Sequence, residues 1–89
     1  MTKLRVWWIP QVPMKPFYAE VSSVEEGVKI MNVLADYDEF QFQNKVKPDY
    51  SNVGGLERYV EEEGEWEDWY DEETGYDDPE EYLRERDNQ

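Results

Sequence analysis

The stretch SVEEGVKIMNVLADY, residues 23–37, predicts the main helix of the fold. Ser23 followed by Glu26 matches the S-x-x-E capping box, in which each side chain bonds the backbone N–H of the other residue. Apolar residues then recur at helical spacing and form one helix face: Val24, Val28, Met31, Leu34 and Ala35, with Ile30 on its flank. The pattern does not decide whether the helix continues through Phe40 and Phe42, which would pack differently in a helix and in a strand.

Two segments before this helix predict neighbouring strands. Residues 3–9, KLRVWWI, are rich in β-branched and aromatic residues, which favour strands. Alternation divides this strand into two faces, which hold Leu4, Val6 and Trp8 and, on the other side, Arg5, Trp7 and Ile9. Both faces are apolar enough for a central strand, and residues 17–21, FYAEV, predict an antiparallel neighbour across a proline-rich connection. A small domain needs its large side chains in the core, which is where we expect Trp7, Trp8, Phe40 and Phe42.

The C-terminal part predicts a hairpin and a short helix. Residues 51–56, SNVGGL, are expected to form a loop whose two glycines are free to adopt positive φ. Residues 56–60 and 65–70 predict strands joined by a loop over 61–64. Asp78 before Pro79 is typical of a helix start. The fold class is therefore α+β: a small antiparallel sheet packed on one main helix, in ββαββ order, with a short C-terminal helix.

Composition excludes several classes of site. The chain has 89 residues, which predicts one domain over 1–89, and it contains no cysteine and no histidine. Disulfides, thiolate metal sites and the usual zinc ligands are thereby absent, and so is the usual general base at neutral pH. No catalytic motif is present, so we expect neither an enzyme nor a cofactor or metal. No apolar run is long enough for a membrane span, and the N-terminus lacks the features of a signal peptide, so a cytoplasmic location is expected.

Charge divides the chain into two parts. The net charge is −14, but residues 1–56 hold six basic and seven acidic side chains, which makes this part near-neutral. Residues 57–89, the acidic third, hold three basic and sixteen acidic side chains. Such a protein repels nucleic acid and acidic membranes and attracts basic surfaces, so we expect neither direct nucleic-acid binding nor membrane binding.

The acidic third has two interpretations. Blocks of like charge are typical of disordered, solvated tails, and that interpretation stays open. Against it stand six aromatic residues that a disordered chain would lack: Tyr59, Trp66, Trp69, Tyr70, Tyr76 and Tyr82. If a strand forms, Glu65 and Glu67 lie about 6.6 Å apart on one face. Such rows of carboxylates can present a phosphate-like field, since each strand of B-DNA carries a phosphate about every 3.4 Å.

Residues 5–56 contain the segments WWIPQVP, KPF and ADYDEFQFQNKVKPDYSNVGG, and an acidic aromatic end follows them. In these segments the chain resembles a family of small proteins found in phages, prophages and mobile elements. The resemblance implies that the expected cytoplasm is that of a host bacterial cell. This resemblance implies no catalytic residues. In charge and size, the acidic third also resembles anti-restriction and anti-CRISPR proteins that mimic DNA.

These observations lead to a functional hypothesis. We expect an inhibitor that binds a basic, nucleic-acid-binding surface of a host defence nuclease, either a CRISPR effector or a restriction enzyme, as an acidic DNA mimic. The alternative is a non-inhibitory phage structural or adaptor protein with a solubilising acidic end. The expected partner-binding residues are Glu61, Glu62, Glu63, Glu65, Glu67, Asp68, Trp69, Tyr70, Asp71, Glu72, Glu73, Asp77 and Asp78.

Overall fold

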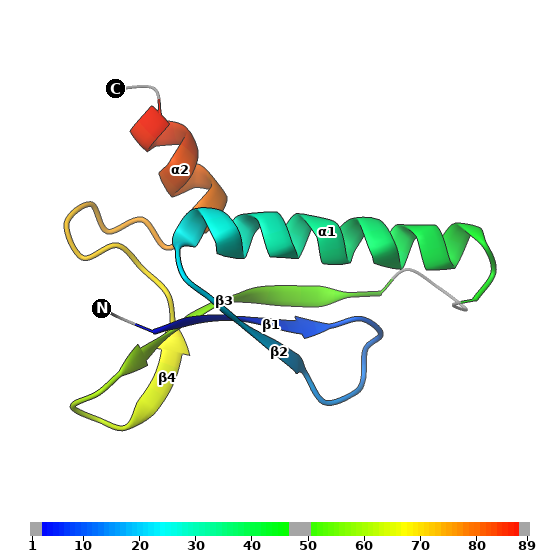
Figure 1. Cartoon of the computed structure of the whole chain (residues 1–89), viewed down its shortest axis with the longest axis horizontal. Coiled ribbons are helices and arrows are strands. Elements are labelled where there is room, and N and C mark those ends of the chain that lie inside the picture. Colours follow the sequence, from blue (N-terminus) through cyan, green and yellow to red (C-terminus); the bar gives the residue numbers. More distant parts are fainter. Residues whose placement is uncertain (1–2, 47–50, 88–89) are drawn as a thin grey trace.

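The computed structural model describes residues 3–46 and 51–87. In chain order these residues form β1 (Leu4–Ile9), β2 (Phe17–Val21), α1 (Val24–Gln43), β3 (Val53–Val60), β4 (Glu65–Asp68) and α2 (Pro79–Asp87). The expected α+β class and the ββαββ order with a short C-terminal helix are confirmed (Figure 1).

The four strands form one antiparallel sheet in the order β2-β1-β3-β4. β1 is therefore a central strand, as the apolar residues on both of its faces predict. Its register places Val6 opposite Ala19 on β2 and opposite Leu56 on β3. Because side chains alternate along a strand, this register turns one side chain from each strand toward α1 and the next away from it.

The core lies between α1 and the inner face of the sheet. Its buried apolar residues are Leu4, Val6, Trp8, Val21, Leu56 and Trp69. α1 adds partly buried side chains from its inner face, namely Val24, Ile30, Met31 and Leu34. Gly27 lets the helix approach β3 closely, because a Cβ on this residue would lie 2.8 Å from Leu56 Cδ1. The periodicity that predicts the helix is therefore the pattern that packs it on the sheet.

α1 begins at the predicted cap. The Ser23 hydroxyl accepts a hydrogen bond from the Glu26 backbone N–H at 3.1 Å. The reciprocal half of the capping box differs from the prediction, because the Glu26 carboxylate accepts from the Ser22 hydroxyl at 2.8 Å. The helix continues past Tyr37 to Gln43, so Phe40 and Phe42 are helical.

The expectation that Phe40 and Phe42 pack in the core is wrong. Phe40 is 60% exposed and Phe42 is 42% exposed. Phe40 follows the buried Asp38 by two residues, which turns it about 200° around the helix axis and away from the sheet. Phe42 lies one turn beyond Asp38, the last buried residue of α1. Trp8 is buried as predicted, whereas Trp7 points from the opposite face of β1 and is only partly covered.

Asp38 ties the second half of α1 to the sheet. Its carboxylate is 2% exposed and accepts a hydrogen bond from Trp8 Nε1 at 2.8 Å. Asn52 Nδ2, just before β3, donates to the same oxygen at 3.0 Å. A buried carboxylate is costly unless it is hydrogen-bonded, so this pair of donors explains how Asp38 occupies an apolar helix face.

Gly54 and Gly55 lie inside β3, and neither has positive φ. Because β3 begins at Val53, the predicted loop over 51–56 is wrong from residue 53 onward. A Cβ on Gly54 would overlap the Trp8 ring, and a Cβ on Gly55 would lie 2.7 Å from Trp7 Nε1. The two glycines make room for neighbouring indole rings rather than for a turn. Positive φ occurs instead at Gly64, in the predicted hairpin loop after β3.

Both helices lie on one side of the sheet (Figure 1). α1 crosses the inner face, and α2 meets its N-terminal end, where Arg86 Nη1 lies 2.7 Å from Glu25 Oε1. The other side of the sheet is covered by no element of the described chain (Figure 1). This arrangement leaves one full face of a four-stranded sheet open.

Candidate interaction surface

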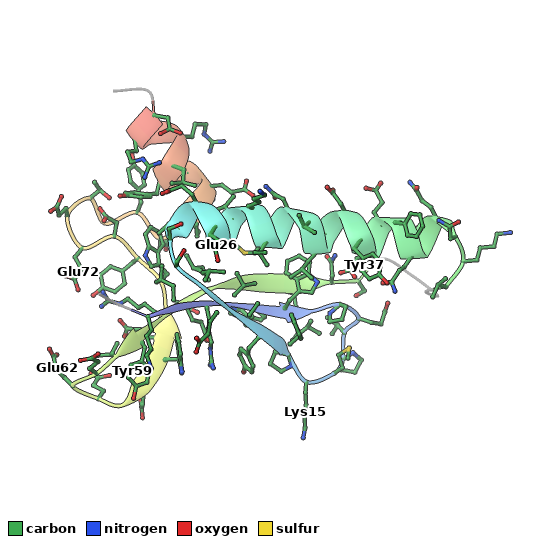
Figure 2. All side chains as sticks on the ribbon, in the orientation of Figure 1. Lys15, Glu26, Tyr37, Tyr59, Glu62 and Glu72 are labelled. Atoms are coloured by element: carbon green, nitrogen blue, oxygen red, sulfur yellow. The ribbon has the colours of Figure 1, made fainter. Side chains whose placement is uncertain are left out.

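The predicted partner-binding residues lie in several environments. The β3–β4 loop and the start of β4 place four exposed carboxylates at one end of the molecule: Glu61, Glu62, Glu63 and Glu65. Within the described residues, the carboxylates of these four side chains form no hydrogen bond or ion pair. Figure 2 shows Glu62 at the tip of this hairpin.

Three other predicted residues are bound to Arg58. Its Nε lies 2.7 Å from Glu67 Oε1, and its Nη1 lies 2.8 Å from Glu72 Oε1. Its Nη2 donates to the Tyr70 hydroxyl at 3.0 Å, while the guanidinium carbon lies 4.3 Å from the centre of the Tyr70 ring. The hydrogen bonds to Glu72 and then Glu67 raise the pKa of Arg58 further above its usual value. The single positive charge of Arg58 compensates part of the negative charge of these two carboxylates, so together they present less negative charge to a partner.

Asp71 and Asp78 have local structural roles. Asp71 Oδ2 accepts from the Thr74 backbone N–H at 2.9 Å and from the Thr74 hydroxyl at 2.6 Å. These bonds lower the pKa of Asp71 and hold a turn that closes at Gly75, where φ is +81°. Asp78 caps α2, as predicted, by accepting from the backbone N–H of Glu80 at 3.0 Å.

Trp69 lies in the core and is not available as a contact residue. It is 8% exposed, and its ring meets Tyr82 of α2 edge-on with the centroids 5.3 Å apart. Tyr70, which is 41% exposed, is the one of the two aromatics that reaches the surface. The remaining predicted acids, Asp68, Glu73 and Asp77, are exposed.

The open side of the sheet carries a second group of residues that face one another across the strands. We call it the outer sheet face, and its central side chains are Arg5, Trp7, Tyr18, Glu57, Tyr59 and Trp66. Each strand contributes at least one of them: β1 supplies Arg5 and Trp7, and β2 supplies Tyr18. Antiparallel sheets usually present polar residues on an open face, so four aromatic rings in this position are unusual.

Arg5 lies at the centre of the outer sheet face. Its guanidinium carbon lies 3.8 Å from the centre of the Tyr18 ring and 4.2 Å from the centre of the Trp66 ring. Its Nε also lies 2.7 Å from Glu57 Oε1. The Trp66 ring in turn meets Tyr59 edge-on, with the centroids 5.2 Å apart. Cation–π and cross-strand contacts of this kind preorganise the surface, since each ring is held by a neighbour.

None of the six residues of this face is among the partner-binding residues predicted from the sequence. The alternation of the first strand indicates part of this face, because it places Arg5, Trp7 and Ile9 together on one side of a predicted central strand. Tyr18 follows the same alternation on β2. What the sequence could not indicate is that both helices pack on the opposite side of the sheet.

Pockets, metal-binding groups and membrane-spanning helices are the remaining candidate features of the described residues. An open depression of about 470 Å³ lies beside the Arg58 cluster, lined in part by Leu4, Tyr70 and Glu73. Within residues 3–46 and 51–87, no group of three or more acidic side chains is arranged to hold a metal ion. No helix of this part of the chain has the length and apolar character needed to cross a membrane.

Comparison with known proteins identifies relatives of the chain. Residues 3–88 match the family described as superinfection exclusion gene product 17. The superinfection exclusion protein of Salmonella phage P22 is 55% identical over 92 aligned positions, which cover 91% of this chain and 89% of the phage P22 protein. No solved structure matches.

These matches confirm the expected relationship to small phage proteins and correct the expected function. Both are to superinfection exclusion proteins, so the hypothesis of an anti-CRISPR or anti-restriction DNA mimic is wrong, and its structural or adaptor alternative is not supported. That hypothesis depended on negative charge, which many unrelated proteins share. The geometry adds a reason, because Arg58 and the local turns engage several of the carboxylates that the hypothesis assigned to a partner.

Proposed function

The chain belongs to the superinfection exclusion gene product 17 family, and from this premise we propose that it acts in superinfection exclusion by binding another protein through its outer sheet face. Superinfection exclusion is the resistance of an infected or lysogenic cell to a further phage. The action is stoichiometric, and it requires no catalytic group or cofactor.

The single observation that supports this proposal is the open, aromatic outer sheet face. Trp, Tyr and Arg are the residues most enriched at the energetic centres of protein interfaces, and Arg5, Trp7, Tyr18 and Trp66 bring all three types together. The rings are held by cross-strand contacts, so little side-chain freedom is lost on binding. Tyr18, at 47% exposed, offers the most accessible ring on this face.

The test is a plating assay with matched variants. Salmonella cells that express the full chain are challenged with a panel of phages, and the plating efficiency of at least one phage is expected to fall. The double variant Tyr18→Ala/Trp66→Ala should restore plating, because it removes two rings of the outer sheet face. The control Val33→Ala/Phe40→Ala removes exposed apolar side chains from α1 and should still exclude the phage.

Two outcomes would contradict the proposal. If expression of the chain changes the plating of no phage in the panel, the proposed role fails. If the α1 control loses exclusion while Tyr18→Ala/Trp66→Ala retains it, the binding surface lies elsewhere. Circular dichroism and thermal melts of both variants show whether each remains folded.

A further inference from the structure

We propose that the outer sheet face docks a cationic segment of its protein partner, with arginine or lysine side chains seated against the aromatic rings and paired with the carboxylates around them. This inference rests on the proposed function and deepens it by naming the chemistry of the partner. Its support comes from three features of the same face: a guanidinium clamp, an excess of acids and the lack of a covering element.

The clamp around Arg5 shows how this face holds a guanidinium. Two rings from different strands flank the guanidinium: the centre of the Tyr18 ring on β2 lies 3.8 Å from the guanidinium carbon, and the centre of the Trp66 ring on β4 lies 4.2 Å from it. Glu57 on the intervening β3 supplies the carboxylate at 2.7 Å. The same chemistry recurs beside it, where Lys3 Nζ lies 5.7 Å from the centre of the Tyr59 ring. Aromatic faces and carboxylates together are what a cation needs when it leaves water.

The acids of this face outnumber its bases. Across the strands, Arg5 lies opposite Glu20 on β2 and opposite Glu57 on β3, and Glu57 lies opposite Asp68 on β4. One cation thus serves a row that holds three carboxylates. Glu20 and Asp68 are both exposed, and neither forms an ion pair within the described chain. The row therefore carries uncompensated negative charge beside apolar rings.

Charge complementarity selects the occupant. A second copy would oppose the same acidic row and the same net charge of −14, so self-association through this face is repelled. Nucleic acid and anionic membranes are repelled for the same reason. A protein segment with basic and apolar residues can contact the rings and pair with the carboxylates. The attraction between its positive charges and the acidic row also speeds association.

The test is a titration of the isotope-labelled full chain, followed by NMR at about 0.15 M salt, where the Debye length of about 8 Å limits diffuse attraction. The probe is a synthetic peptide of alternating arginine and valine, and the control peptide alternates glutamine and valine. Saturable shifts are expected at the Trp7 and Trp66 indole N–H signals and at the Tyr18 amide with the arginine peptide. The glutamine peptide should bind at least about tenfold more weakly, because it lacks every charge contact.

Matched variants separate a local site from general acidity. Glu20→Gln/Asp68→Asn removes two charges from the outer sheet face without touching a ring, and it should weaken the arginine peptide about threefold or more. Glu80→Gln/Glu81→Gln removes the same charge from α2, on the other side of the sheet, and should leave the affinity within about twofold.

Several results would overturn the inference. These are equal weakening by the two variant pairs, an arginine peptide that shows no saturable binding, or shifts confined to α2. Concentration-dependent shifts of this face without peptide would assign it to a second copy instead. The two proposals fail separately: if Tyr18→Ala/Trp66→Ala abolishes exclusion but no cationic peptide binds, the partner has other chemistry. If the peptide binds and exclusion is unaffected by that variant, the proposed function fails.

Discussion

At the scale of single residues, carboxylates that look alike in the sequence have different roles. Asp71 accepts two hydrogen bonds from Thr74 and holds a turn, whereas Glu62 extends into solvent from the hairpin loop. Asp38 is buried on the inner face of α1, and its carboxylate accepts a hydrogen bond from the Trp8 indole N–H. The donors within reach decide the role in each case, because a hydrogen-bonded carboxylate is stabilised in its charged form and an isolated one is simply solvated.

Asp71→Asn should lower the stability of the protein at neutral pH and have little effect in acid. The Thr74 bonds lower the pKa of Asp71 in the folded state below its ordinary value of 3.8. The charged form is therefore favoured by folding, and this contribution is fully present above pH 3.8. It is lost as the pH falls through the lowered pKa, so the difference in melting temperature between the two proteins should shrink there.

The matched control for this experiment is Asp77→Asn. Asp77 lies just beyond the same turn and makes no hydrogen bond with another described residue. Its substitution removes the same charge, so it reports the general effect of a less acidic chain. A difference between Asp71→Asn and wild type that stays constant from pH 7 to strong acid would contradict the assigned role.

At the scale of elements, α1 is longer than its apolar pattern. The pattern ends at Ala35, but the helix runs to Gln43. From its middle onward, the helix has exposed apolar residues on the outside, including Val33, Tyr37 and Phe40. On the inside, the bonds from Trp8 and Asn52 to Asp38 hold it to the sheet. Apolar packing therefore attaches the first half of α1 to the sheet, and the hydrogen bonds of Asp38 attach the second half.

Asp38→Ala should destabilise the protein by about 1–3 kcal/mol, because it leaves the Trp8 and Asn52 donors without this acceptor in a buried site. Hydrogen exchange should speed up most in the second half of α1. Asp36→Ala is the control, since Asp36 is exposed on the same helix and its loss should change stability by no more than about 0.5 kcal/mol. Urea unfolding measures both, and equal effects of the two variants would show that Asp38 is not an anchor.

At the scale of the whole molecule, charge and apolar surface are separated. The hairpin and the segment before α2 hold most of the acids, and Figure 2 places Glu62 and Glu72 toward the same end of the molecule. Figure 2 shows Lys15 on the β1–β2 connection and Tyr37 on the second half of α1, both away from that end. Arg58, Arg84 and Arg86 offset part of the acidic field, but residues 57–89 keep a net charge of −13.

The melting temperature should rise with added salt. Repulsion among the acids destabilises the folded chain, and raising NaCl from about 20 mM to about 500 mM shortens the Debye length from roughly 20 Å to about 4 Å. Screening also weakens the few ion pairs, but the uncompensated charges outnumber them. Glu61→Gln/Glu62→Gln/Glu63→Gln should raise the melting temperature at low salt and reduce its salt dependence. A wild-type melting temperature that falls with salt would mean that the ion pairs dominate.

Local patterns in the sequence predict which elements form and where most of them begin. The Ser23 cap, the apolar spacing of α1, the alternation of β1 and the Asp78–Pro79 helix start all depend on residues close together in the chain, and the structure confirms each of them. The same helical spacing also predicts that Asp38 lies on the inner face of α1, because it follows Met31 by seven residues and Leu34 by four. A carboxylate at an apolar-stripe position predicts a buried, hydrogen-bonded acid.

The positions of the interacting surfaces depend on contacts between residues that are far apart in the chain. Trp69 and Tyr70 are adjacent in sequence, yet packing against Tyr82 buries one and Arg58 holds the other at the surface. The sequence predicts a loop at Gly54 and Gly55, because the indole rings that these glycines accommodate belong to a different strand. The outer sheet face joins Arg5 to Glu57 across 52 residues of sequence, and it is open because both helices pack on the other side. Such long-range pairing depends on how the whole chain buries its apolar surface, which no local pattern encodes.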